Sequence, residues 1–339
     1  MGQIAFYSGV NEKLYNAAFT WVGHVRGGLA MATVMACAAF SAICGSNAAT
    51  AATMTTVALP QMTRYKYNPM LSTGAIACGS ALGVVIPPSV VLIIYWLSTE
   101  QSIAKLFYGG FGAGILLAFL LTLSVYVICT IFPAWGPIGE KTSFKEKIRS
   151  LAGAMEMLIL FAVVMAGLFV GLFTPTEAGA VGSFFAVVIS VFQKTLSWKN
   201  FYNTIFDTLK VSCMVFVIIA GAMVFGRFLA IIFLIYAFGG MVMDSLALLL
   251  ITIPIFYPVA IKLGYDPIWF GVVITVITTL GAVTPPVGAT AYVVGGMAKT
   301  VPLEKVFQGV LYFLPAYVVC IILMMLFPEI VLYLPGLLK

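Results

Sequence analysis

Apolar runs long enough to cross a membrane recur from one end of this 339-residue chain to the other. About 20 apolar residues in a helix span the hydrocarbon core of a bilayer. The composition agrees, because 62% of the residues are hydrophobic and 8% are charged, whereas soluble domains carry roughly 25% charged residues. The sequence therefore predicts an all-α, polytopic protein whose surroundings are a lipid bilayer.

The formal net charge of +6 says little about partners in such a protein, because the placement of Lys and Arg sets its orientation. Lys141, Lys145, Lys147 and Arg149 lie in the predicted loop 133–150, and the next basic loop holds Lys194, Lys199 and Lys210. Two predicted crossings, 151–173 and 176–192, separate these loops, which places both on the cytoplasmic face. We expect no nucleic-acid partner.

Two of the apolar runs are interrupted by a proline pair. Pro87 and Pro88 lie in "GVVIPPSVV", and Pro285 and Pro286 lie in "GAVTPPVGA". A proline inside a helix removes a hydrogen bond and clashes with the preceding turn, at a cost of about 3 kcal/mol or more. Non-helical backbone survives at membrane depth only where protein buries it or a wet cavity adjoins it. The pairs therefore predict two broken helices within a protein interior.

Two further elements have apolar arms too short for a full crossing. Residues 29–44 and 48–60 flank the polar stretch "GSN", and a second short-armed element surrounds "MVMDS". Short arms around a polar tip indicate re-entrant hairpins. Each tip also has a purely structural interpretation: Ser46 and Asn47 form a tight turn between packed helices, and Asp244 caps the helix that follows.

The hairpins and broken helices form an internal repeat. Moving the sequence along itself by 198 positions places Pro60 on Pro258, Tyr67 on Tyr265, Pro69 on Pro267, Gly83 on Gly281, and one proline pair on the other. Five predicted crossings separate the copies (70–97, 107–132, 151–173, 176–192 and 207–240). Because five is odd, the second copy enters the membrane from the opposite side, as in the inverted repeats of secondary transporters.

The repeat gives the predicted domain layout. The first repeat, 1–132, contains an arm (1–28), a hairpin (29–60), a broken helix (70–97) and a crossing (107–132). A basic cytoplasmic loop (133–150) precedes the second repeat, 151–334, with crossings in 151–240, a hairpin (239–261), a broken helix (268–297) and a last crossing (307–334). We expect the crossings 107–132, 151–173, 176–192 and 307–334 to form a scaffold around the hairpins and broken helices.

Broken helices expose N–H and C=O groups near the bilayer midplane, where carbonyl ends attract Na⁺ and N–H ends attract anions. The chain shows no catalytic pairing and no CxxC spacing, and it has one histidine, so we predict neither an enzyme nor a cofactor beyond Na⁺ as coupling ion. The predicted Na⁺ ligands are Ser46, Asn47, Asp244, Ser245 and Thr284. The wider predicted ion and substrate site comprises these residues with Gly83, Pro87, Pro88, Ser89, Met243, Gly281, Pro285, Pro286 and Gly288.

In these stretches the chain resembles the large membrane subunit, DctM type, of tripartite ATP-independent periplasmic (TRAP) transporters. The matching stretches include "GGLAMATVMACAAFSAICGSNAATAA", "GVVIPPSVVLIIYW", "FTPTEAGAVGS" and "LGAVTPPVGATAYVV". The resemblance implies a Na⁺-driven, elevator-type importer of small organic acids in the bacterial inner membrane. It also implies two partners, a small DctQ-type membrane subunit and a periplasmic DctP-type binding protein.

Two departures from the family pattern follow from the residues. The family's N-terminal scaffold helices are not found before the first arm. The long arm "SGVNEKLYNAAFTWVGHVRGG" also has no counterpart in the second copy, where "FGRFLA" runs directly into "IIFLIYAFGG", so a segment near residue 230 is missing. The alternatives are a stand-alone Na⁺/organic-anion symporter of the same architecture and, with less support, a channel.

Overall fold

The computed structural model describes residue 4 and residues 10–139, 143–170, 172–192, 196–210, 212–213, 245–286 and 288–337. The regular elements in these ranges are helices. Apart from them, these ranges contain one isolated antiparallel β-bridge, between Arg26 and Ile138. The prediction of an all-α fold is confirmed. The helices, in chain order, are α2 (Val10–Val22), α3 (Gly28–Cys44), α4 (Asn47–Arg64), α5 (Pro69–Ser80), η1 (Ala81–Val84), α6 (Val90–Thr99), α7 (Ile103–Ile131), η2 (Pro133–Trp135), α8 (Phe144–Phe169), α9 (Pro175–Phe192), α12 (Ser245–Lys262), α13 (Pro267–Val283), α14 (Ala289–Met297), α15 (Leu303–Leu311), α16 (Leu314–Leu326) and α17 (Glu329–Gly336).

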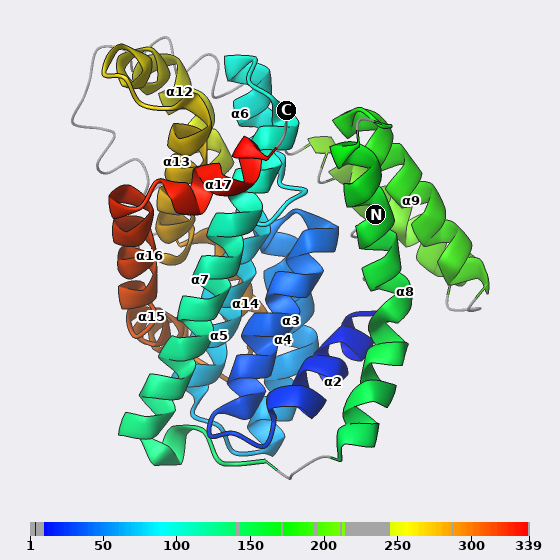
Figure 1. Cartoon of the computed structure of the whole chain (residues 1–339). Coiled ribbons are helices and arrows are strands. Elements are labelled where there is room, and N and C mark those ends of the chain that lie inside the picture. Colours follow the sequence, from blue (N-terminus) through cyan, green and yellow to red (C-terminus); the bar gives the residue numbers. More distant parts are fainter. Residues whose placement is uncertain are drawn as a thin grey trace.

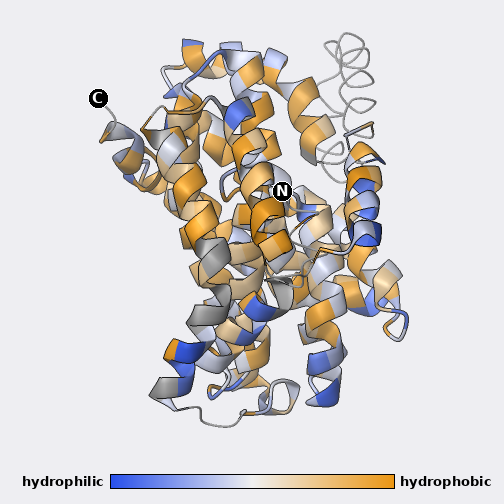
Figure 2. Ribbon diagram, turned by 90° about the vertical axis from the view of Figure 1, so that its right-hand side faces the viewer, coloured by the Kyte–Doolittle hydropathy of each residue, from blue (hydrophilic) through white to orange (hydrophobic). Residues whose placement is uncertain are grey.

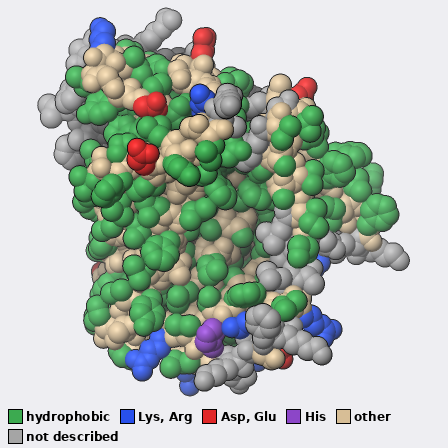
Figure 3. Space-filling view, viewed as in Figure 1, with side chains coloured by type: hydrophobic (Ala, Val, Ile, Leu, Met, Phe, Trp, Pro, Cys, Tyr) green, Lys and Arg blue, Asp and Glu red, His purple; other side chains and the backbone are tan. Residues whose placement is uncertain are grey.

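Two stretches of helix are long and apolar enough to cross a membrane, Ile103–Ile131 and Leu303–Leu326, and several shorter helices are also apolar. Hydrophobic residues predominate through the middle of the ribbon (Figure 2). On the face seen in Figure 3, apolar side chains cover the middle, and the Lys, Arg, Asp, Glu and His side chains gather toward the two ends. This distribution is the one a bilayer requires, since a charged side chain is costly at its centre.

The helices of the two copies begin at equivalent positions. α4 and α12 begin at Asn47 and Ser245, and α5 and α13 begin at Pro69 and Pro267, each pair 198 positions apart. The starts of α5 and α13 also use the same chemistry. Asn68 Oδ1 accepts from the N–H of Met70 (2.8 Å), and Asp266 Oδ1 accepts from the N–H of Ile268 (2.8 Å). In each case a capping side chain precedes a proline at the first helical position, where proline is favoured.

The equivalent helices α5 and α13 start at opposite ends of α7 (Figure 1). Asn68, before α5, donates its N–H to the carbonyl oxygen of Trp135, just beyond the end of α7 (3.0 Å). Pro267, at the start of α13, accepts from the hydroxyl of Tyr95 (2.7 Å) and lines a surface pocket with Ser102, the residue that caps α7. The two broken helices therefore run in opposite directions.

The two copies are interlocked by close helix contacts. α6 of the first copy packs against α12, and α14 of the second copy packs against α4. A Cβ atom on Gly74 would lie 2.7 Å from the carbonyl carbon of Gly309, so α5 and α15 touch backbone to backbone. The equivalent pair is Val272, 198 positions after Gly74, and Gly109, 200 positions before Gly309 at the slightly longer offset that the repeat has after its broken helix. It is also in contact, with 3.1 Å between a Cβ on Gly109 and a methyl group of Val272. Small residues permit such approaches between membrane helices.

The packing separates a compact body from a peripheral pair of helices. α7 and α15–α17 pack against the hairpin and the broken helices, with α17 lying along α7 and α15 along α5. α8 instead packs mainly against α2 and α9 (Figure 1). This grouping differs from the expectation that 107–132 and 307–334 belong with 151–173 and 176–192, because hydropathy identifies a crossing but not its neighbours.

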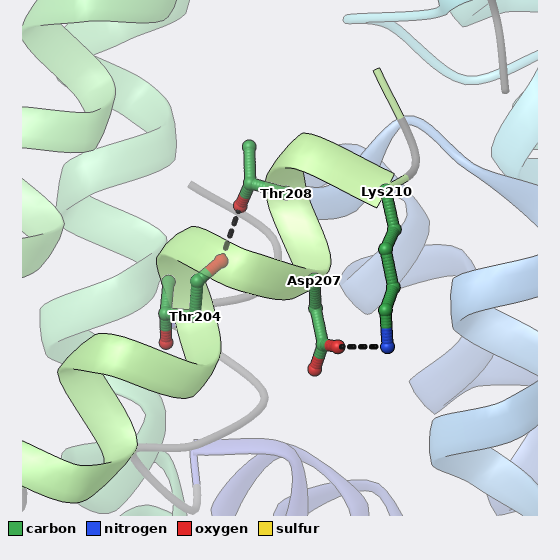
Figure 4. A network of polar contacts seen from close by, with 4 residues as sticks. All are labelled: Thr204, Asp207, Thr208 and Lys210. Carbon is green, nitrogen blue, oxygen red and sulfur yellow. Dashed lines mark hydrogen bonds and ion pairs between the residues drawn. The ribbon is translucent and has the colours of Figure 1, made fainter. Parts of the chain in front are cut away.

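Several expected boundaries are corrected. The last crossing is divided into α15, α16 and α17, and Pro315 and Pro328, which lack the N–H that a continuous helix would use, lie at the starts of α16 and α17. The basic stretch 133–150 is not all loop, because α8 begins at Phe144 and contains Lys145, Lys147 and Arg149. Lys199 and Lys210 likewise lie in a helix, 198–210. In that helix Lys210 pairs with Asp207 (4.0 Å), and Thr208 donates to the carbonyl oxygen of Thr204 (2.7 Å) (Figure 4).

Candidate functional site

The first hairpin turns sharply at Gly45 and Ser46, between α3 and α4. Gly45 has φ +65°, in the left-handed region that glycine tolerates, and donates its N–H to the carbonyl oxygen of Ser41 (2.8 Å). Ser46 then caps α4, because its Oγ accepts from the N–H of Ala49 (3.4 Å). Asn47 is half-buried, and its Oδ1 accepts from the N–H of Ala48 (2.8 Å). The predicted tip is thus a two-residue turn between helices.

This tip lies directly against the first proline break. A Cβ atom on Gly83 would lie 3.0 Å from the carbonyl oxygen of Ser46 and 3.1 Å from the amide nitrogen of Asn47. A Cβ on Gly45 would collide with the carbonyl oxygen of Pro88. Backbone meets backbone on both sides of this contact, which therefore requires both glycines. The structure brings together the predicted residues Ser46, Asn47, Gly83 and Pro88.

The first break is a capped interruption of the helix. α5 tightens into the 3₁₀ turn η1, which ends at Val84, and α6 begins at Val90. The Pro87–Pro88 peptide bond is cis. Ser89 is fully buried; its hydroxyl donates to the carbonyl oxygen of Val84 and accepts from the N–H of Leu92 (3.3 Å). One serine thus satisfies a carbonyl of the first half-helix and an N–H of the second.

The second break has the same outline with different capping. α13 ends at Val283, and the hydroxyl of Thr284 donates to the carbonyl oxygen of Gly281 (3.3 Å). The Pro285–Pro286 bond is cis, and residue 287 lies outside the described residues. Gly288 precedes α14 with φ +46° and has no side chain to cap it. The structure places Gly281, Thr284, Pro285, Pro286 and Gly288 at one interruption of the helix.

The predicted second tip is only partly described. Met243 and Asp244 lie outside the described residues, as does the side chain of Ser245, although α12 begins at Ser245. The structure therefore does not place a second tip against the second break. The predicted site is assembled from the first tip, the first break and the second break.

Sequence reasoning missed two hydroxyl groups close to these elements. Ser41 lies in the last turn of α3 and Thr290 in the first turn of α14; both are buried, and neither side-chain oxygen has a hydrogen-bond partner. The available signal was Thr290's position, four residues after Pro286, which leaves no helical carbonyl to accept from it.

The described part of the candidate site consists of helix ends and uncharged side chains. The sequence between 28 and 63, between 67 and 99, and between 267 and 298 has no Asp, Glu, Lys, Arg or His. Among the described residues, no group of three or more His, Cys, Asp or Glu side chains is placed where it could hold a metal ion. An ion bound here would meet carbonyl oxygens, hydroxyls and amides, and the dipoles of α4, α6 and α14, which begin at the tip and the breaks.

Comparison with a known family agrees with this geometry. The family model for the DctM component of tripartite ATP-independent periplasmic transporters matches residues 1–231 and 226–330. Together these two matches cover nearly all of the chain. They meet at 226–231, where the sequence indicates a missing segment.

Curated relatives align along the same length. The C4-dicarboxylate TRAP transporter large permease protein DctM of Pseudomonas aeruginosa is 31% identical over 353 residues, covering 97% of this chain and 82% of the relative. The sialic acid TRAP transporter large permease protein SiaM of Vibrio cholerae is 31% identical, covering 99% and 84%. The isethionate TRAP transporter permease protein DctMQ of Oleidesulfovibrio alaskensis is 30% identical, covering 97% and 55%.

The aligned length of 353 positions exceeds the 339 residues of this chain, so the first relative has residues that the chain lacks. The apolar helices, the hairpin at a helix break and the family match all agree. The chain belongs to the DctM family of membrane-embedded TRAP transporter large permease components.

Proposed function

We propose that this chain is the permease subunit of a Na⁺-coupled, binding-protein-dependent secondary transporter that imports small organic acids by an elevator mechanism. The observation that carries the proposal is the backbone contact between the first hairpin tip and the first break. This contact holds Ser46 and Asn47 beside Gly83 and Pro88, and the segments that form it, 28–63 and 67–99, contain no charged residue. Carbonyl and hydroxyl oxygens held in this way suit a hard cation such as Na⁺.

Two ion positions follow from the inverted repeat. The first would use oxygens of Ser46 and Asn47 and the carbonyls that end η1. The second would use Thr284 with Asp244 and Ser245. The substrate carboxylate would lie between them, near the N-termini of the half-helices, where the helix dipole favours negative charge.

The packing supports a moving body that includes more helices than the hydropathy pattern indicates. α7 and α15–α17 would move with the hairpins and broken helices, because they pack closely against them. α8 and α9 would belong to the stationary scaffold. α2 packs against both α3 and α8, and the indole of Trp21 donates to the carbonyl oxygen of Lys147 (3.2 Å). α2 would therefore connect the moving hairpin to the scaffold.

The proposed partners are a small DctQ-type membrane subunit and a periplasmic DctP-type binding protein in the bacterial inner membrane. The DctMQ relative supports the first partner, because this chain covers 55% of that longer permease protein. The excess of basic residues in 141–149 supports a cytoplasmic location for that end of the molecule.

The test is uptake of radiolabelled organic acids by the full-length chain in proteoliposomes, with and without a Na⁺ gradient, small subunit and binding protein. Ser46→Ala and Asp244→Ala are each expected to abolish Na⁺-dependent uptake, since each removes a proposed Na⁺ ligand. Transport by both variants at the wild-type rate, with the same dependence on Na⁺, would show that the tips are not the ion sites. Uptake without a binding protein would favour a stand-alone symporter, and flux that does not saturate would favour a channel.

A further inference from the structure

The half-helices that follow the two breaks differ in how their N-termini are capped. α6 begins with Ser89, whose hydroxyl accepts from the N–H of Leu92. α14 begins with Gly288, which provides no side chain to cap it. A side chain could not be added there, because a Cβ on Gly288 would lie 2.7 Å from the ring of Phe307. Free N–H groups at a helix N-terminus need another acceptor.

The first turn of α14 also contains Thr290, which is 1% exposed and has no hydrogen-bond partner for its Oγ1. Many buried threonines donate to a carbonyl oxygen of the preceding turn, as Thr33 does to Leu29 and Thr275 to Gly271, each four residues earlier (both 2.8 Å). For Thr290 that residue is Pro286, which precedes the helix. The break thus removes the acceptor that a helical threonine normally uses.

A hydroxyl that is buried and unsatisfied destabilises the protein that contains it, so its presence points to a partner absent from the isolated chain. The partner must be an acceptor, because the neighbouring N–H groups of α14 are donors. Side chains tilt toward the N-terminus of their helix. Thr290 Oγ1 therefore lies at the level of those N–H groups.

The surroundings favour an anion over a cation at this position. α14 packs against α4 and α5, and both α4 and α14 lead away from the tip and the break toward the end where α5 begins. Their N-terminal dipole ends are thus on the same side, and α4, α5 and α14 contain no acidic side chain. A negative group would be stabilised by both helix ends.

We propose that the N-terminal turn of α14 and Thr290 Oγ1 bind a carboxylate group of the transported acid, an inference that rests on the proposed function. The carboxylate accepts from the hydroxyl of Thr290 and from the uncapped N–H groups. At the first break, by contrast, the hydroxyl of Ser89 accepts from the N–H of Leu92, so the start of α6 has a side-chain cap that α14 lacks. The substrate is therefore held asymmetrically, at the second break.

The experiment uses the full chain in lipid nanodiscs, with succinate and N-acetylneuraminate as probes in NaCl. Thermal unfolding and equilibrium binding are measured for Thr290→Val, Thr290→Ser and the wild type. Valine keeps the shape and removes the hydroxyl. It is expected to weaken binding of the acid by about 10-fold or more, the effect of losing a hydrogen bond to a charged group. Serine is expected to restore binding. Because the hydroxyl is unsatisfied without substrate, the Tm of ligand-free Thr290→Val should equal or exceed that of the wild type.

Thr279→Val is the matched control, because the buried hydroxyl of Thr279 donates to the carbonyl oxygen of Val276 (2.6 Å). It should lower Tm and leave acid binding unchanged. Wild-type affinity for the acid in Thr290→Val would overturn this inference and leave the proposed function standing. A lower Tm of ligand-free Thr290→Val, with no restoration of acid binding in Thr290→Ser, would do the same. If the wild type binds neither acid in NaCl, the proposed substrate class fails and the inference fails with it.

Discussion

Tyr67 and Tyr265 occupy equivalent positions in the two repeats, just before α5 and α13, yet the first is 7% exposed and the second 50% exposed. The Tyr67 hydroxyl accepts from the N–H of Leu29 (3.2 Å) and donates to the carbonyl oxygen of Pro137 (3.0 Å). Tyr265 stacks on Trp269, with ring centroids 5.4 Å apart. The backbone of the turn is repeated, whereas the surroundings that give the side chain its role are not.

The same contrast holds at the breaks and at the helix contacts. Both breaks have a cis proline pair, but Ser89 closes the first and Gly288 leaves the second open. The repeat therefore specifies where helices start and stop. The residues that differ between the copies decide which half-helix end is available to a ligand.

The largest expected effect comes from adding a methyl group where the first tip contacts the first break. Gly83→Ala places a methyl group 3.0 Å from the carbonyl oxygen of Ser46 and 3.1 Å from the amide nitrogen of Asn47, so the backbone of the tip must shift to admit it. We expect Na⁺-dependent uptake to fall at least tenfold. Gly296→Ala is the control, because a Cβ there meets nothing within 4 Å. Equal uptake by the two variants would show that the tip contact is not needed.

A smaller effect should distinguish the equivalent glycines Gly309 and Gly109. A Cβ on Gly309 would collide with the backbone of Met70, whereas a Cβ on Gly109 would meet side-chain methyl groups of Val272 and Val331 at 3.1 Å and the carbonyl oxygen of Val331 at 3.2 Å. The clash at Gly309 is closer and falls on backbone alone, while two of the three contacts at Gly109 are with side chains that can adjust. Gly309→Ala is expected to destabilise the chain by about 2 kcal/mol, within the range for overpacking, and Gly109→Ala by less. Thermal unfolding in detergent measures both, and the reverse order would contradict the packing described.

The smallest effect concerns the tyrosine pair itself. Tyr67→Phe removes a buried hydroxyl that has two partners and should cost about 1–2 kcal/mol. For Tyr265→Phe we expect a change within about 0.5 kcal/mol, as for most exposed substitutions. Comparison of the two Tm values measures the difference. If the variants were equally stable, the two tyrosines would not differ in their surroundings as the structure indicates.

Much of this architecture could be predicted from the sequence because breakers and caps are local signals. The proline pairs and the "GSN" turn identify the breaks and the first tip, and parity of crossings indicates opposite directions. Packing partners could not be predicted in this way. α7 and α8 are both long and apolar, and only the contacts of α7 with the broken helices show that it belongs to the compact body.

The roles of individual side chains were also beyond local signals. Ser89 was predicted as a site residue, and the structure shows that its hydroxyl is occupied in capping α6. For Thr290 the position four residues after Pro286 is a local signal that a helical acceptor is missing, but the burial that leaves its hydroxyl without any partner depends on helices distant in sequence. Asp244, the charged candidate, lies outside the described residues.

The most direct test of the central claim, that the first tip and break form a Na⁺ site, is the Tm of the purified chain as NaCl replaces choline chloride at constant ionic strength. A Na⁺-specific rise in Tm is predicted for the wild type, since a ligand that binds the folded state stabilises it by an amount that grows with the ligand concentration relative to Kd. The rise should be lost in Ser46→Ala. Identical Tm values in the two salts, or an undiminished rise in Ser46→Ala, would contradict the account.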